Sequence, residues 1–327
     1  MTRTLLLFSN DFGSSVRIFF DDQTMPKLKK LFAARRAAPA RKLFFFSLLL
    51  IFALPALAHA QQKKKDQTPD TPPPALMRTT TRHETKRLGY GSTITILGAP
   101  KGSITIEGWN KSEIDVTADI ELHAGTEEDL ARLAQVNSFT LDKDGNHVRV
   151  ITTGTHDKKF MKKAKDFPKN LLGLPWQVDY HIRVPQMCDL EIDAGHGPIK
   201  LSGVEGAISL KAVESDANLT LSGGILMATV AKGRVNLNIG SRSWRGRGAE
   251  IRLALGDMTV QLPTGFSADI NADVLRTGKV ENSYTGLEAR EDTTVTERSL
   301  KGRTGAGGVV LIFTVGDGTI SISNSDK

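Results

Sequence analysis

Cysteine is almost absent from this chain, and Cys188 is the only one. An exported domain held together by disulfides would carry an even set of cysteines, so this fold must rest on its own hydrophobic core. Cys188 precedes an alternating run in which Leu190 and Ile192 are the apolar members. We therefore expect Cys188 to be a small buried hydrophobe rather than a nucleophile or a metal ligand.

Motifs of catalysis and metal binding are also missing. The sequence has no GxSxG, no Walker-type loop, and no HxH or HExxH spacing among its histidines. His196 stands in a Gly-His-Gly segment near Asp193, which we interpret as a surface turn. We expect no enzymatic activity, no cofactor and no metal site. A polysaccharide-cleaving enzyme stays open as an outside alternative, although the acidic residues it would need are scattered along the chain.

No apolar run is long enough for an ordinary membrane span of roughly 20 residues. The longest run lies within 43–60, LFFFSLLLIFALPALAHA, after Arg41-Lys42. A basic flank, a short apolar core and a small-x-small ending are typical of a secretory signal, so we predict an export signal over 1–60, cleaved after Ala60. Met25 opens a more ordinary basic segment and is an alternative start. The product is expected in the periplasm, on the cell surface or secreted.

A basic excess is missing from the exported part. Of 43 Lys and Arg and 36 Asp and Glu, 34 and 33 follow residue 60. Nucleic-acid-binding domains usually carry a basic excess, so nucleic acid is not an expected partner. Membrane contact is expected only through an uncleaved signal or peripherally. Residues 61–87 begin QQKKKDQTPDTPPPA and are predicted to be a disordered Lys/Pro-rich linker.

From Leu88 onward the apolar residues alternate with polar ones. The clearest run, 114–122, reads IDVTADIEL, which indicates a strand with one buried face. One helix is predicted over 127–136, where Thr126 and Asp129 resemble a capping box. Residues 142–146, DKDGN, have the chemistry of a hairpin turn. We expect 88–185 to be an irregular β region that packs against or continues the following repeats.

Residues 186–327 repeat a short apolar-x-apolar strand every 8 to 11 residues, with glycines in nearly every gap. No helix-length segment separates these strands, so a βαβ arrangement is excluded. The pattern predicts an all-β, Gly-punctuated, right-handed β-solenoid (β-helix-like), with a sandwich or barrel as alternatives. The residues expected to be buried are Ile199, Leu201, Ile208, Leu210, Leu219, Leu221, Val235, Leu237 and Ile239.

Several stretches resemble a family of exported bacterial β-repeat domains of unknown function, called putative adhesins and related to the head domain of putative autotransporter adhesins. The resembling stretches are 102–109, 180–185, 197–206, 262–263 and 316–322. The likeness spans roughly 88–323. It implies a stacked right-handed β-solenoid and no known enzymatic activity. A lysine-rich insert at 156–175 and an arginine-rich loop at 241–248 depart from the simple pattern.

These two departures are the candidate binding loops. The insert places Lys158, Lys159, Lys162 and Lys163 around aromatic residues, which suits a polyanion, although a solvated loop is the simpler interpretation. In the loop 241–248, Trp244 could stack on a sugar while arginines bind its acidic groups. The arginines are Arg242, Arg245 and Arg247.

We therefore expect an exported, non-enzymatic envelope or surface protein that serves as an adhesin or scaffold. The alternative is a binding module for acidic polysaccharide or an anionic membrane surface through the two basic loops. Expected partners are an acidic glycan, the envelope surface or another protein. The two hypotheses differ in whether both basic loops project from the same face.

Overall fold

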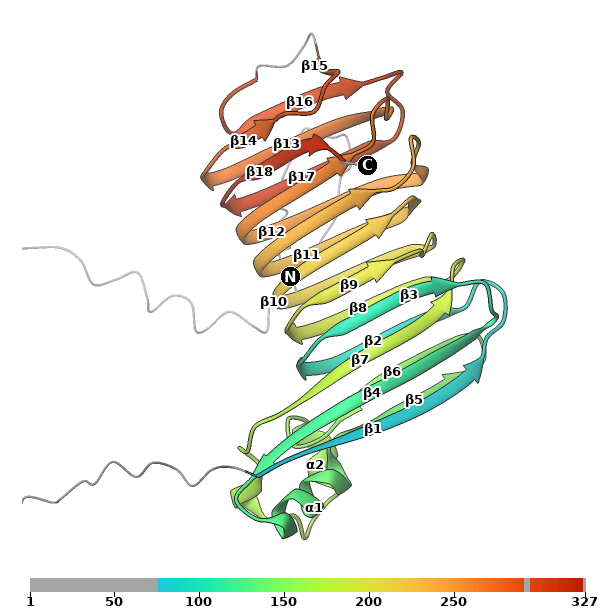
Figure 1. Cartoon of the computed structure of the whole chain (residues 1–327), viewed down its shortest axis with the longest axis vertical. Helices are drawn as coiled ribbons and strands as arrows, with labels where there is room; N and C mark the ends of the chain where they lie inside the picture. Colours follow the sequence, from blue (N-terminus) through green and yellow to red (C-terminus); the bar gives the residue numbers. More distant parts are fainter. Residues whose placement is uncertain (1–75, 291–294, 326–327) are drawn as a thin grey trace, which may run out of the picture. The chain divides into compact units, whose positions relative to one another are not determined.

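The computed structural model describes residues 76–290 and 295–325, and these form an all-β fold (Figure 1). The export signal and residues 61–75 lie outside the described residues, so the predictions about them stay predictions. Within the described ranges, no helix is both long and apolar enough to span a membrane. The strands join into one large mixed sheet that does not close on itself. The alternative prediction of a barrel is therefore wrong.

The strands occur in chain order as β1 (Leu76–Arg87), β2 (Thr93–Lys101), β3 (Ile104–Trp109), β4 (Glu113–Ala124), β5 (Ser138–Asp144), β6 (His147–Thr153), β7 (Trp176–Pro185), β8 (Asp189–His196), β9 (Ile199–Ser202), β10 (Ala207–Leu221), β11 (Gly223–Ile239), β12 (Arg245–Leu262), β13 (Ala268–Thr277), β14 (Val280–Asn282), β15 (Leu287–Ala289), β16 (Ser299–Thr304), β17 (Val310–Asp317) and β18 (Ile320–Asn324). The helical segments are α1 (Glu127–Val136), α2 (Lys158–Met161) and the 3-10 turn η2 (Lys169–Leu171).

The strands stack in two layers that face each other across the core. Layer one contains β6, β2, β8, the first halves of β10, β11 and β12, then β17 and β13, all paired in parallel. Layer two contains β7, β3, β9, the second halves of β10, β11 and β12, then β18 and β14, also in parallel. Each coil of the chain contributes one strand to each layer.

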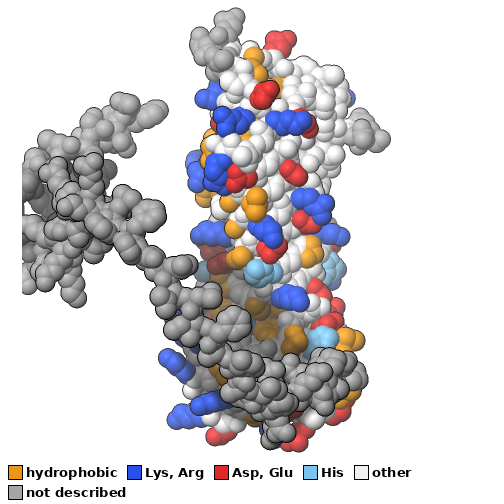
Figure 2. Space-filling view, turned by 90° about the vertical axis from the view of Figure 1, so that its left-hand side faces the viewer, with side chains coloured by type: hydrophobic (Ala, Val, Ile, Leu, Met, Phe, Trp, Pro, Cys, Tyr) orange, Lys and Arg blue, Asp and Glu red, His pale blue; other side chains and the backbone are white. Residues whose placement is uncertain are grey.

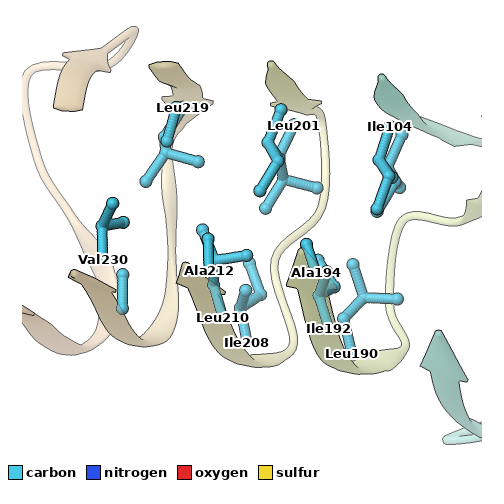
Figure 3. Packing of buried hydrophobic residues seen from close by; sticks show 14 of the residues in the cluster. Ile104, Leu190, Ile192, Ala194, Leu201, Ile208, Leu210, Ala212, Leu219 and Val230 are labelled. Carbon is cyan, nitrogen blue, oxygen red and sulfur yellow. The ribbon is translucent and has the colours of Figure 1, made fainter. Parts of the chain in front are cut away.

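The predicted recurrence of 8 to 11 residues therefore corresponds to half a coil. Ile208 pairs with Leu190 in layer one, and Ala217 pairs with Ile199 in layer two, so both halves of β10 lie 18 residues after their partners. The apolar side chains of the two layers point toward one another between the strands (Figure 3). All nine residues predicted to be buried are buried in the core, which confirms that part of the sequence analysis.

The coils do not stack in sequence order. The coil made of β2 and β3 lies between the β6–β7 coil and the β8–β9 coil. At the other end, β17 and β18 lie between β12 and the β13–β14 coil. Antiparallel strands complete both ends, with β4, β1 and β5 at one end and β16 and β15 at the other. Residues 88–185 thus continue the same stack as the later repeats.

Two edges connect the layers. Within a coil the chain bends from layer one to layer two at what we call the first edge, and it returns to layer one at the second edge. A column of glycines with positive φ occupies the first edge, and Gly233 shows why. A Cβ on Gly233 would collide with the carbonyl of Ser215 in the neighbouring coil, and its φ is 133°. Only glycine combines this backbone conformation with so close an approach.

The predicted helix and hairpin are confirmed. Helix α1 covers Glu127–Val136, and the hydroxyl oxygen of Thr126 accepts a hydrogen bond from the Asp129 backbone N–H at 3.1 Å. Strands β5 and β6 form the antiparallel hairpin, with Gly145 at φ 59° in its turn.

The linker prediction is wrong for residues 76–87, because they form β1, which pairs along its whole length with β4. The sequence of β1 has no apolar alternation, since β1 lies at the end of the stack and points Arg82 rather than an aliphatic side chain inward. Arg82 donates hydrogen bonds to the Ser138 hydroxyl and to the Phe139 carbonyl, and its guanidinium lies over the Phe139 ring. Charged side chains on an exposed edge strand also discourage pairing with other chains.

Candidate functional site

The two basic loops lie at opposite edges of the stack. The lysine-rich insert joins β6 to β7 and so replaces a tight first-edge bend, at the end of the stack that carries α1 and α2 (Figure 1). The arginine-rich loop joins β11 to β12 and lies at the second edge. The two loops therefore do not form a single ligand-binding surface.

The lysine-rich insert is anchored at both ends and exposed in between. Asp157 caps the start of helix α2, and its carboxylate accepts hydrogen bonds from the backbone N–H groups of Lys159 and Phe160 at 2.8 and 3.1 Å. These bonds lower the pKa of Asp157. Leu171 is buried and Phe167 packs against the core, so these two side chains anchor the insert.

The predicted lysines of the insert all lie on its exposed surface. Lys158, Lys159, Lys162 and Lys163 form no ion pair with any residue that the structure describes. They provide positive charge that the fold itself does not use.

Trp244 is placed differently from the prediction. Its side chain is 6 % exposed, and its indole N–H donates to the carbonyl oxygen of Gly224 on the neighbouring coil at 3.0 Å. A ring that stacks on a sugar must be exposed, so the prediction that Trp244 is a ligand-stacking residue is wrong. Burial of so large an aromatic ring is more favourable than its exposure.

The arginines of the same loop are exposed. Arg245 forms an ion pair with Glu205 and also lies within hydrogen-bond distance of the Ser222 hydroxyl. Arg242 and Arg247 make no ion pair within the described part of the chain. The candidate site at this loop is therefore reduced to Arg242 and Arg247, with no exposed aromatic ring beside them.

Cys188 and His196 occupy the positions expected of them. Cys188 is 2 % exposed, and burial, followed by the charge of Asp189, raises the pKa of its thiol to about 12. It is therefore the small buried hydrophobe that the sequence predicts. His196 is an exposed residue at a first-edge bend, where its Nδ1 lies 3.6 Å from a carboxylate oxygen of Glu214. No group of three His, Cys, Asp or Glu in the described ranges could hold a metal ion.

A small cavity of about 120 Å³ lies where β1, β4 and α1 meet. Asn137 lines it and is 1 % exposed, and its side-chain oxygen accepts a hydrogen bond from the Thr155 backbone N–H at 2.9 Å. The Nδ2 group of Asn137 has no partner among the described residues. Arg82 also borders the cavity but is neutralised by Glu84 at 2.7 Å. The volume and polarity suit a few water molecules.

The sequence analysis did not identify the outer surface of layer two. From β9 to β18, two columns of its outward side chains cross the strands, beside a charged column of Asp216, Arg234 and Asp257 nearer the first edge. The members of the two columns are Lys200, Asn218, Asn236, Thr259 and Ser321 in one, and Ser202, Thr220, Asn238, Gln261 and Ser323 in the other. Nine of these ten are uncharged and polar. In the sequence, these positions are the residues on either side of the apolar centre of a repeat, such as Asn218 and Thr220 around Leu219.

No family model matches the sequence, and no curated protein matches it. Three similar solved structures illustrate the comparison. A putative cell adhesion protein from Clostridium sporogenes is 13 % identical, with 75 % of this chain and 100 % of that chain covered and a TM-score of 0.42. A putative adhesin from Bacteroides fragilis is 12 % identical, with 75 % and 97 % covered and a TM-score of 0.27. A putative lipid binding protein from Parabacteroides distasonis is 12 % identical, with 76 % and 97 % covered and a TM-score of 0.18.

These structural neighbours are mainly described as putative adhesins, in agreement with the resemblance noted from the sequence. The identities and TM-scores are too low for the likeness to carry an argument about function. The functional argument therefore rests on the surfaces of this chain.

Proposed function

We propose that this chain is an exported, non-enzymatic surface or envelope protein that acts as an adhesin or scaffold through the faces of a right-handed β-solenoid. The observation that supports this most is the parallel, in-register stacking of coils, which repeats the same outward positions along two extended faces. A repeated surface can make many weak contacts with an extended or repetitive partner, and their combined strength exceeds that of each contact.

The surface charges support a structural use of the ionisable residues. Lys232 pairs with Glu214 at 2.7 Å and Arg234 pairs with Asp216 at 2.8 Å, each linking β11 to β10. Hydrogen bonds from Lys232 and Arg234 lower the pKa values of these two carboxyl groups. Positive and negative side chains also lie next to each other over the face in Figure 2. Exposed pairs of this kind add little stability individually but favour one register between coils.

Export is proposed from the sequence of residues 41–60, with its basic flank, short apolar core and small-residue ending. Expression of the full chain in a bacterial host, followed by fractionation and intact-mass measurement, tests this step. We expect a product that begins at Gln61 outside the cytoplasm. A product that retains residues 43–60 would instead indicate a membrane anchor.

Binding through both basic loops together is not favoured, because the loops lie at opposite edges and the Trp244 ring is buried. The proposed function can be tested by incubating the purified exported chain with bacterial cells and envelope fragments, and with immobilised glycans, lipid vesicles and proteins. We expect retention on at least one of these surfaces, with no shortened or unsaturated oligosaccharide released. Released products would support the polysaccharide-cleaving alternative, and no retention on any surface would refute the adhesin proposal.

A further inference from the structure

Ten outward positions of layer two, in two adjacent columns between β9 and β18, form a surface that we call the polar strip. Its members are Lys200, Ser202, Asn218, Thr220, Asn236, Asn238, Thr259, Gln261, Ser321 and Ser323. We propose that the polar strip binds an extended, uncharged polysaccharide that lies along the stack and crosses the strands. This inference rests on the proposed adhesin function and identifies the face and the partner class that carry it.

Parallel pairing keeps the two columns of the strip straight. Asn218 pairs with Asn236 and Thr220 pairs with Asn238, and the next strand places Thr259 beside Asn236. The Asn236 side-chain amide donates to the side-chain oxygen of Asn218 at 2.9 Å. Neighbouring strands in a sheet are about 4.8 Å apart, so the strip offers hydrogen-bonding groups at a regular spacing close to the length of one sugar unit in an extended glycan.

The fold does not require this surface to be uncharged. Lower in the same layer, and in β4 beside it, charged or titratable side chains occupy equivalent outward positions of β3, β4 and β7. Arg183 lies 2.9 Å from Asp115, and His181 lies 3.5 Å from Glu107. Charged pairs therefore suit the outer face of this layer as well as amides and hydroxyls do. In these two columns the uncharged side chains extend from Ser202 and Asn218 as far as β18, and charge returns at Glu281 in β14, which pairs with Ser321.

The chemistry of the strip matches a neutral glycan. Hydroxyl and carboxamide groups both donate and accept hydrogen bonds, as sugar hydroxyls do. Lys200 at its lower end is the only charged side chain of the strip, so an acidic polymer would find a single counter-charge there. Ser, Thr, Asn and Gln are also shorter than the Lys and Arg side chains that cover other parts of the surface. The strip lacks the Trp, Tyr and Arg residues that dominate protein–protein hot spots, which makes a protein partner less suitable.

The experiment measures retention of the exported chain on insoluble or immobilised neutral glucans, with polygalacturonate and alginate as acidic probes. The test variant combines Thr220→Arg with Asn236→Arg, which places two long charged side chains in the middle of the strip. The matched control combines Ser209→Arg with Met227→Arg. It alters the same two strands, β10 and β11, at outward positions of layer one. Thermal melting verifies that both variants are folded.

We expect the wild type to bind at least one neutral glucan, with little change in binding when salt is raised, because no ion pair is involved. The strip variant should bind about tenfold more weakly or worse, and the control should bind like the wild type. Equal binding by the strip variant, equal loss in the control, or salt-sensitive binding to acidic glycans alone would overturn the inference. A wild type that attaches to envelope fragments but to no neutral glycan would overturn the inference and leave the proposed function standing. A wild type that attaches to nothing would overturn both.

Discussion

The indole N–H of Trp244 donates to the backbone carbonyl of Gly224 at 3.0 Å and thereby joins the second edges of two neighbouring coils. From the sequence, Trp244 is predicted to be an exposed ligand-stacking residue, because it lies in a loop rich in Ser, Arg and Gly. In the structure its ring is part of the hydrophobic core. Trp244 therefore contributes to the stability of the coil, and the consequences of its removal should be those of a core substitution.

We expect Trp244→Ala to lower the free energy of unfolding by about 3–5 kcal/mol, because the large ring leaves a cavity. Trp244→Phe keeps most of the volume and loses the hydrogen bond, so it should cost about 1 kcal/mol. Urea denaturation followed by circular dichroism measures both. Unchanged stability in Trp244→Ala, together with loss of glycan binding, would restore the ligand-stacking hypothesis.

Gly233 tests the glycine column at the first edge. Replacement by Ala forces a Cβ against the Ser215 carbonyl at a φ of 133°. Such strain costs on the order of 1–3 kcal/mol before any clash is relieved, so a clear fall in melting temperature is expected. Gly240→Ala is the matched control, because a Cβ there meets nothing within 4 Å. If the two variants melt at the same temperature, the column is not required for coil stacking.

Burial of Cys188 predicts a specific response to pH. The pKa of its thiol is raised from 9.0 to about 12, so the folded chain holds this proton more tightly than the unfolded chain. The stability from this group is complete below pH 9 and decreases as pH rises from about 9 to 12. We also expect the native thiol to react very slowly with a disulfide reagent at mildly alkaline pH and rapidly after unfolding. Fast labelling of the native chain would contradict this placement of Cys188.

We expect the lysine-rich insert, rather than the arginine-rich loop, to bind anionic surfaces. Replacement of Lys158, Lys159, Lys162 and Lys163 by Gln should leave the melting temperature nearly unchanged, since they are exposed and make no ion pair among the described residues. Any retention of the wild type on anionic vesicles at low salt should be lost in this variant. Arg242→Gln with Arg247→Gln is the comparison at the opposite edge. If that variant rather than the lysine variant abolishes vesicle binding, the assignment to the insert is wrong.

The sequence predicted the buried residues of the fold better than the order of its strands and the character of its outer surface. Alternation identified the buried members of each repeat, such as Leu219 and Val235, because a strand buries every second side chain. It could not show that β18 pairs between β12 and β14, since the hydrophobic pattern does not encode which distant strands become neighbours. The strand β1 was missed because its inward residue Arg82 is charged. The polar strip was not identified because uncharged polar residues at outward positions resemble ordinary solvated ones.

The inserted position of β18 gives the last prediction. Among the described residues β18 is the final strand in sequence, yet it pairs with β12 on one side and β14 on the other. Its Ile322 is 1 % exposed. Ile322→Ala should therefore cost about 2–5 kcal/mol, as at any fully packed core position. Leu287→Ala in β15, a half-buried residue at the end of the stack, should cost distinctly less. Ser323→Ala, adjacent to Ile322 but facing outward, controls for changes in the strand itself. Chemical denaturation of the three variants ranks them, and an Ile322→Ala cost no larger than that of Ser323→Ala would show that β18 is not held between two coils.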